Sequence, residues 1–171
     1  MDLKTHIRTV ADFPKPGIQF YDITTLLLHA EAWRETVDLL AQAVRKYQPD
    51  VLAGIESRGF IFGAPVAYAL GVGFIILRKK GKLPGSKASH TYALEYGNDT
   101  IEMHDDAVQA GQRVVLIDDL LATGGTMDAA VRLLRGVGAV VPAAACVIEL
   151  TFLKGRGRLD IPVEALLTYD D

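Results

Sequence analysis

Cysteine is almost absent from this chain of 171 residues, since Cys146 is the only one. One cysteine cannot form an intrachain disulfide, and this one lies in the largely apolar stretch 143–150, where we expect a buried small side chain rather than a catalytic thiol. No run approaches the roughly 18 apolar residues of a membrane span, and the first residues lack the apolar core of a signal peptide. These absences predict a cytoplasmic protein with no membrane partner.

An excess of positive charge is also missing. The chain has 18 Lys and Arg residues against 21 Asp and Glu residues, for a formal net charge of −3. A nucleic-acid-binding domain usually carries a basic face, so we expect no nucleic-acid partner. The histidines show no metal-ligand spacing, which argues against zinc; they are His6, His29, His90 and His104. Half of the residues are hydrophobic, and we expect one domain with a proper core over residues 1–171.

Strand and helix patterns alternate along the chain. This order predicts an α/β fold with a central, mainly parallel twisted sheet flanked by helices. We expect strands at 51–55, 72–77, 114–117 and 163–169, with another inside 140–150, and helices at 33–44, at 60–70 and from 126 to about 137, where Gly136 and Gly138 are stop signals. Leu3, Ile7 and Val10 suggest a short amphipathic helix. Residues 79–87 read as a mobile loop, and 92–96 with 100–104 as a projecting β-hairpin.

The most informative segment is Val114-Val-Leu-Ile-Asp-Asp-Leu-Leu-Ala-Thr-Gly-Gly-Thr126. An apolar strand leads into Asp118 and Asp119, at the carboxyl end where open α/β sheets bind ligands. Gly124 and Gly125 permit a tight turn and close approach of an anion, and the following helix N-terminus favours phosphate. The glycine patterns of ATP and dinucleotide loops are absent. Thr-Gly-Gly-Thr alone also suits an ordinary strand–turn–helix, but the acidic pair favours a ribose phosphate.

This segment resembles the phosphoribosyl pyrophosphate motif of the type I phosphoribosyltransferases. The resemblance runs from about residue 13 to about residue 155. It implies transfer of ribose 5-phosphate from phosphoribosyl pyrophosphate to N9 of adenine, giving AMP and pyrophosphate in purine salvage. Four further segments carry it: Phe13-Pro-Lys-Pro-Gly-Ile-Gln-Phe-Tyr-Asp-Ile23, Gly54-Ile-Glu-Ser-Arg-Gly-Phe-Ile-Phe-Gly63, Leu77-Arg-Lys-Lys-Gly-Lys-Leu-Pro-Gly85 and Tyr92-Ala-Leu-Glu-Tyr-Gly97.

The resemblance also implies catalytic roles. Asp118 and Asp119 hold the ribose hydroxyls and stabilise the positive charge that develops on the sugar. Arg58 stabilises the departing pyrophosphate, although an arginine here also suits a helix cap on the surface. Glu95 manages the proton on the purine, with an exposed strand residue as the alternative. No covalent intermediate is required.

Further substrate-binding residues follow from the resemblance. Ser57 and Gly59 belong to the pyrophosphate loop, and residues 80–89 match a lid that excludes water. Arg78, Lys79, Lys82 and Lys87 form a basic run, and such a run is often only a solvated face. Residues 1–30 contribute to the base site, which is read largely by main-chain groups; many relatives have Arg where this chain has Tyr21, and Ala where it has Ser57. The other implied contacts are Gln19, Phe20, Arg78, Lys79, Lys82, Tyr96, Leu120, Ala122, Thr123, Gly124, Gly125 and Thr126.

Mg²⁺ is the expected cofactor, held mainly by substrate oxygens and water with no direct protein ligand. The family is typically dimeric, so we expect a homodimer with the N-terminal segment and the 60–70 helix as candidate interface. Three alternatives stay open. In the first, the enzyme uses hypoxanthine, guanine or xanthine as the acceptor base. In the second, the chain is a ligand-binding regulator on the same scaffold, and in the third it is a nucleotide-binding domain without catalysis.

Overall fold

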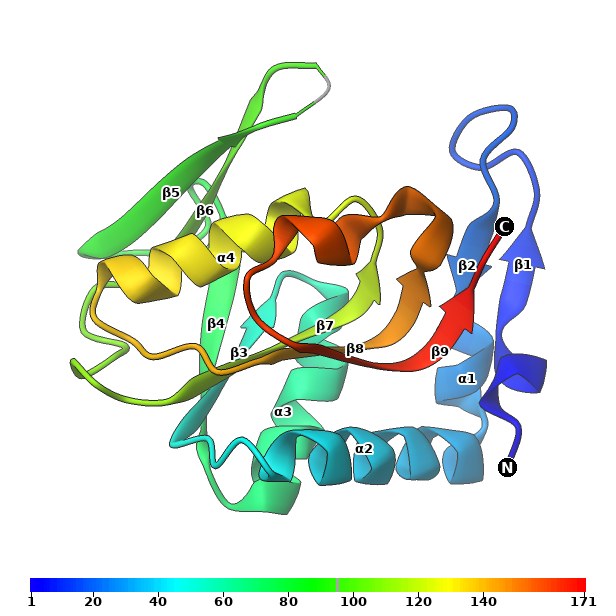
Figure 1. Ribbon diagram of the computed structural model, residues 1–171, viewed down its shortest axis with the longest axis horizontal. Helices are drawn as coiled ribbons and strands as arrows, with labels where there is room; N and C mark the ends of the chain where they lie inside the picture. Colours follow the sequence, from blue (N-terminus) through cyan, green and yellow to red (C-terminus); the bar gives the residue numbers. More distant parts are fainter. Residues whose placement is uncertain (95) are drawn as a thin grey trace.

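The structure, a computed structural model, describes residues 1–94 and 96–171 (Figure 1). Two sheets contain its strands, which are β1 (Arg8–Val10), β2 (Phe20–Asp22), β3 (Val51–Ile55), β4 (Gly73–Lys79), β5 (Lys87–Ala93), β6 (Asn98–His104), β7 (Val114–Leu121), β8 (Ala144–Leu150) and β9 (Val163–Tyr169). The α-helices are α1 (Thr24–Leu28), α2 (Ala30–Arg45), α3 (Arg58–Leu70) and α4 (Gly125–Gly136). Short 3₁₀ helices are η1 (Leu3–His6), η2 (Thr151–Leu153) and η3 (Gly155–Arg158).

The larger sheet has seven strands in the order β5-β6-β4-β3-β7-β8-β9, and the smaller one pairs β1 with β2. From β4 to β9 all neighbours are parallel, whereas β6 runs antiparallel to both β4 and β5. The β5–β6 hairpin projects from one end of the molecule (Figure 1). The predicted α/β fold with a mainly parallel sheet and a projecting hairpin is confirmed. None of the helices described is long and apolar enough to span a membrane.

Both faces of the parallel strands are covered by helices, which explains the unbroken apolar run in β7. Val115 and Ile117 belong to the cluster packed with α2 and α3. Val114 and Leu116 point to the other face and pack with α4. All four side chains are fully buried, as expected for a strand whose alternate residues enter two separate cores.

The helices that follow the two central strands, β3 and β7, lie on opposite faces of the sheet. After β3 the chain enters α3 on one face of the sheet, and after β7 it enters α4 on the other. Because β3 and β7 are adjacent and parallel, their carboxyl ends open a crevice between these two departures. Such a switch point is where open α/β sheets bind ligands.

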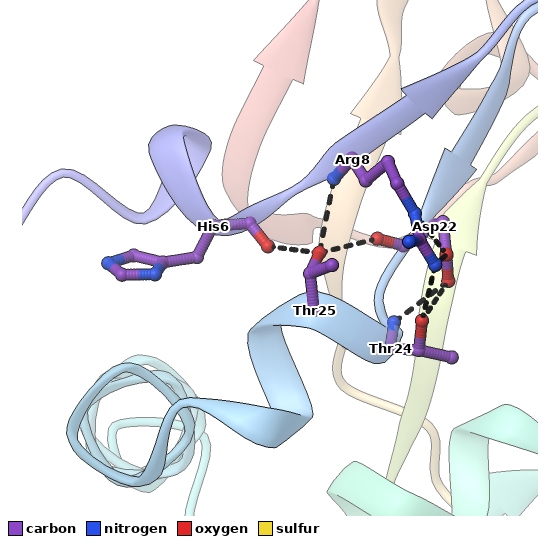
Figure 2. A network of polar contacts seen from close by, with 5 residues as sticks. All are labelled: His6, Arg8, Asp22, Thr24 and Thr25. Atoms are coloured by element: carbon purple, nitrogen blue, oxygen red, sulfur yellow. Dashed lines mark hydrogen bonds and ion pairs between the residues drawn. The ribbon is translucent and has the colours of Figure 1, made fainter.

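A polar network holds the N-terminal segment together (Figure 2). The Arg8 Nε donates to Asp22 Oδ2 at 3.0 Å, and the Thr24 N–H donates to Asp22 Oδ1 at 2.9 Å. Hydrogen bonds from the Thr24 hydroxyl and N–H, with help from Arg8, lower the pKa of Asp22 to about 2. The Thr25 hydroxyl donates to the His6 carbonyl at 2.6 Å. This network joins β1 and β2 to the start of α1.

The predicted amphipathic helix through Leu3, Ile7 and Val10 is wrong. The 3₁₀ helix η1 ends at His6, and Val10 lies in β1 opposite Phe20. The three apolar residues have helical spacing, but β1 gains strand partners from β2, and tertiary pairing overrides so short a pattern.

Several predicted boundaries also move. The strands at 51–55 and 163–169 are confirmed, and the strand inside 140–150 is β8. Helix α3 begins at Arg58 rather than residue 60, and β4 extends to Lys79, so Arg78 and Lys79 are strand residues. The hairpin strands are 87–93 and 98–104 rather than 92–96 and 100–104, which leaves 80–86 as the loop. Its edge strand β5 is mostly polar and shows little hydrophobic alternation, so its pairing could not be read from the sequence.

Candidate active site

A cavity of about 460 Å³ opens at the carboxyl ends of β3 and β7. Many of the residues selected from the sequence line it, namely Ser57, Arg58, Lys79, Asp118, Asp119, Leu120, Ala122, Thr123, Gly124, Gly125 and Thr126. Other lining residues were not selected; they are Ile55, Glu56, Leu121 and Met127. Strand pairing brings residues 55–58 close to residues 118–127, because β3 pairs with β7 up to Gly54 opposite Ile117.

The acidic pair lies on the part of β7 that continues past its pairing with β3. Strand β7 runs to Leu121, so both carboxylates are strand residues rather than loop residues. Asp119 is only 6% exposed, and the Arg58 Nε lies 2.8 Å from its Oδ2. The Asp119 N–H donates to Asp118 Oδ1 at 2.8 Å. Burial, reinforced by the negative charge of Asp119, raises the pKa of Asp118 well above its ordinary value.

This raised pKa makes the Asp118 charge a cost to folding. The folded protein holds the Asp118 proton more tightly than the unfolded chain does, so the free energy of unfolding falls as the pH rises above about 3.8. The loss is complete above the raised pKa. We therefore expect Asp118→Asn to increase Tm at neutral pH, with a gain that shrinks as the pH falls toward 3.8.

Thermal unfolding followed by circular dichroism across this pH range measures the effect. The asparagine side chain introduced by Asp118→Asn keeps an oxygen that can accept the hydrogen bond from the Asp119 N–H, so the substitution removes mainly the charge. The control is Asp106→Asn at an exposed position, which we expect to show no pH-dependent gain. A lower Tm for Asp118→Asn at neutral pH would contradict the argument.

The phosphate turn, defined here as residues 122–126, joins β7 to α4. Gly124 is the residue before the helix and has a φ of +85°, a conformation that favours glycine. No side chain among the described residues caps this N-terminus by a hydrogen bond. The N–H groups of the first helical turn therefore have no side-chain acceptor and suit an anion.

Three of the predicted pyrophosphate cations, Arg58, Arg78 and Lys79, already have acidic partners. Arg78 pairs with Glu56 at 3.1 Å, and the Lys79 N–H donates to Glu56 Oε2 at 2.7 Å. Burial of Glu56 would raise its pKa, but these hydrogen bonds outweigh burial and lower it. The Lys79 ammonium pairs with Asp99. Of the four selected cations, Arg58 and Lys79 line the cavity, Arg78 and Lys82 do not, and Lys82 is exposed.

The sequence analysis missed Glu56 and Asp99. Glu56 directly follows strand β3, and an acidic residue at a strand end two residues before Arg58 is the signal that could have found it. Asp99 gave no such signal, because its pairing with Lys79 depends on the register of β4 and β6.

The residues predicted to read the base lie outside the cavity lining. Phe20 lies beside a lining residue, with its ring centre 5.6 Å from the guanidinium carbon of Arg58. The Tyr21 side chain is buried; its hydroxyl donates to the Asp171 carbonyl at 3.1 Å, and its ring packs on Tyr169. Only the main chain of Tyr21 is therefore available to a ligand. Gln19 is exposed and does not line the cavity.

Two other residues selected from the sequence, Gly59 and Tyr96, are not among the lining residues of the cavity. Gly59 is buried where α3 approaches β7, and a Cβ there would lie 3.0 Å from Asp118 Oδ1, so its visible role is close packing. Tyr96 is 81% exposed and does not line the cavity. Glu95 lies outside the residues that the structure describes.

A second cavity of about 380 Å³ lies on the hairpin side of the phosphate turn. It shares Thr123, Gly125 and Thr126 with the first cavity. Its remaining lining residues, which the sequence analysis did not select, are Tyr92, Ala93, Leu94 and Arg158. The phosphate turn is thus the wall between two openings.

A parallel sheet with an acidic strand end, followed by a phosphate turn at a helix N-terminus, defines a protein that binds a phosphorylated sugar. The chain belongs to the phosphoribosyl transferase domain family, whose model matches residues 23–162. The resemblance to the phosphoribosyltransferases seen in the sequence is thereby confirmed.

Individual relatives are similar over nearly their whole length. An adenine phosphoribosyltransferase of Rhodospirillum centenum is 64% identical over 170 residues, covering 99% of each chain. The crystal structure of the adenine phosphoribosyltransferase from Thermoanaerobacter pseudethanolicus has a TM-score of 0.95 at 48% identity, covering 98% of each chain. The enzyme of that name from Saccharomyces cerevisiae, complexed with D-2,5-dideoxy-2,5-imino-altritol 1,6-bisphosphate and adenine, has a TM-score of 0.92 at 40% identity, covering 97% of each chain.

Proposed function

We propose that this protein transfers ribose 5-phosphate from phosphoribosyl pyrophosphate to N9 of adenine, giving AMP and pyrophosphate in purine salvage. The observation that carries the proposal is the cavity in which the acidic pair and the phosphate turn meet Arg58 and Lys79. The names of the relatives that are 48% and 64% identical support adenine as the acceptor base.

The acidic pair suits a reaction in which positive charge develops on a sugar. In this proposal Asp118 and Asp119 bind the ribose hydroxyls, and their charge stabilises the cation as the bond to pyrophosphate stretches. Such an interaction strengthens toward the transition state and therefore accelerates the reaction. The ion pair with Arg58 holds the Asp119 carboxylate in place before substrate binds.

The opposite end of the donor carries the leaving group. We assign pyrophosphate to Arg58 and Lys79 in the cavity, with Ser57 and Gly59 in its loop and Arg78 and Lys82 nearby. Glu56 and Asp99 neutralise Arg78 and Lys79, so these cations exchange partners when pyrophosphate binds. When bound, Mg²⁺ supplies positive charge to the pyrophosphate oxygens. In this proposal the ion is held mainly by substrate oxygens and water.

The base lies, in this proposal, between the N-terminal segment and the cavity. Leu120 lines the cavity and covers one face of the ring, and Phe20 lies beside Arg58 on the other side. Main-chain groups at Gln19 and Tyr21 read the base. Glu95 manages the proton on the purine, and Tyr96 orients the lid formed by residues 80–89.

A radiolabelled adenine assay tests the proposal. We expect label to appear in AMP only when phosphoribosyl pyrophosphate and Mg²⁺ are present, with release of one pyrophosphate per AMP. Competition among adenine, hypoxanthine, guanine and xanthine tests the choice of base, and we expect the enzyme to convert adenine in preference to the other three. Binding of the donor without any pyrophosphate release would favour the regulator or the non-catalytic binding domain instead.

We also propose that one phosphoribosyltransferase domain spans residues 1–171 and forms a homodimer. Two exposed apolar side chains support an interface, since Leu28 in α1 is 85% exposed and Tyr68 in α3 is 90% exposed. Sedimentation equilibrium measures the assembly, and a single species of 18.5 kDa would contradict the dimer. The cytoplasmic location remains a prediction.

A further inference from the structure

The segment 151–158, which follows β8 and contains η2 and η3, packs directly on the phosphate turn. A Cβ built on Gly155 would lie 2.2 Å from the Ala122 carbonyl oxygen, and one built on Gly124 would lie 2.4 Å from the Gly155 carbonyl oxygen. Two stretches of main chain therefore touch with no room for a side chain between them. The position of segment 151–158 is consequently tied to the shape of the turn.

An ion pair between the exposed Arg156 and the buried Glu149 anchors the same segment to the sheet. Glu149 lies in β8 and is only 5% exposed. The Arg156 Nε donates to Glu149 Oε1 at 3.0 Å, while one terminal nitrogen donates to Oε2 and the other to the Val163 carbonyl. A bidentate pair of this kind fixes orientation as well as position. The main chain around Arg156 therefore has a set direction relative to β8.

Arg158, two residues further along, lies against the phosphate turn. Its Nη1 is 2.9 Å from the place that a Cβ on Gly125 would take, and it lines the second cavity with Thr123 and Thr126. Two other cations line the cavities, and both are occupied, since Arg58 pairs with Asp119 and Lys79 pairs with Asp99. Among the described residues, the Arg158 guanidinium has no ion-pair or hydrogen-bond partner.

We propose that Arg158 is a further substrate-binding residue, which contacts the 5′-phosphate of the donor and of AMP. This inference rests on the proposed function. The turn supplies N–H groups and hydroxyls with only partial charges, whereas a phosphate monoester carries nearly two negative charges. A guanidinium adds a full charge and a planar pair of donors that match phosphate oxygens. The Glu149–Arg156 pair holds Arg158 where this contact can form.

The test is Arg158→Gln, which keeps a long polar side chain and removes the charge. We expect KM for phosphoribosyl pyrophosphate to rise about tenfold, as for the loss of one charge-assisted hydrogen bond, while kcat and KM for adenine change by less than about twofold. Affinity for AMP, measured by calorimetry, should fall in parallel, whereas affinities for adenosine and for inorganic pyrophosphate should not change. A folding defect would not weaken the binding of the donor and of AMP while leaving the affinities for adenosine and pyrophosphate unchanged.

Two companion variants complete the experiment. Arg158→Lys keeps the charge but lacks the planar pair of donors of a guanidinium. We expect its donor KM to lie between those of the wild type and Arg158→Gln. The matched control is Lys154→Gln, an equal loss of charge at an exposed position of the same segment that lines neither cavity, and its donor KM should equal that of the wild type.

The outcomes separate the two proposals. If the wild type forms AMP but Arg158→Gln has unchanged donor KM and AMP affinity, the role of Arg158 is refuted and the proposed function stands. Equal weakening of AMP and adenosine would also refute a phosphate contact. If the wild type forms no AMP, the proposed function itself fails.

Discussion

Replacing Asp118 and Asp119 together by asparagine is expected to lower kcat by about three orders of magnitude, in the range seen when one strong electrostatic contact to a transition state is removed. Asparagine has nearly the same shape as aspartate but no charge, so the ribose hydroxyls keep hydrogen-bond partners while the developing cation loses its counter-charge. Circular dichroism of the double variant must show that it is folded, because Asp119→Asn also removes the ion-pair partner of Arg58. Single-turnover measurement of AMP formation, with the donor saturating, reports on this step.

Two controls make the double variant interpretable. Asp106→Asn removes a charge from an exposed position outside both cavities and should leave kcat unchanged. Asp119→Asn alone separates the contribution of Asp119, the partner of Arg58, from that of Asp118. Near-normal turnover in a folded double variant would remove the carboxylates from the proposed mechanism.

Gly124→Ala is expected to raise KM for phosphoribosyl pyrophosphate by about tenfold or more and to lower Tm. The new methyl group meets the Gly155 carbonyl oxygen at 2.4 Å, and the φ of +85° is unfavourable for alanine by roughly 1–2 kcal/mol. The turn and segment 151–158 must therefore separate, which misaligns the N–H groups that bind the 5′-phosphate. Gly124→Val should be worse, because its branched Cβ fits this φ even less well.

The matched control is Gly157→Ala, at a glycine where a Cβ would meet no atom within 4 Å. We expect its donor KM and Tm to stay near those of the wild type. Initial rates at varied donor concentration, with adenine saturating, measure the effect. An unchanged donor KM for folded Gly124→Ala would contradict the assignment of the turn to the donor phosphate.

Asp118 and Gly124 each carry a local cost to the stability of the fold. Desolvation and the neighbouring Asp119 raise the pKa of Asp118, and Gly124 keeps a left-handed conformation against another segment of main chain. Both features are expected to matter more to ligand binding than to folding. Proteins commonly accept such local costs where a ligand must meet a prearranged surface.

Some parts of this protein could be read from the chain without its structure. Strand β3, the strand and turn around Asp118, and helix α4 each carry a local signal, because burial on both faces demands an unbroken apolar run and a tight turn demands glycine. The family resemblance rests on these same local segments. They suffice to predict the α/β fold and the place of the ligand.

Contacts between distant segments left no such local signal. The polar edge strand β5, the packing of the Tyr21 side chain on Tyr169, and the pairing of Lys79 with Asp99 depend on neighbours that only the folded sheet brings close. Arg158 is the clearest example, because it lies far beyond Gly125 in the chain and reaches the phosphate turn only through the fold. The sequence by itself determined which strands are buried and where the phosphate turn lies, since those depend on local composition. Only the tertiary structure decided which charges surround that turn, because charge pairing depends on distance in space.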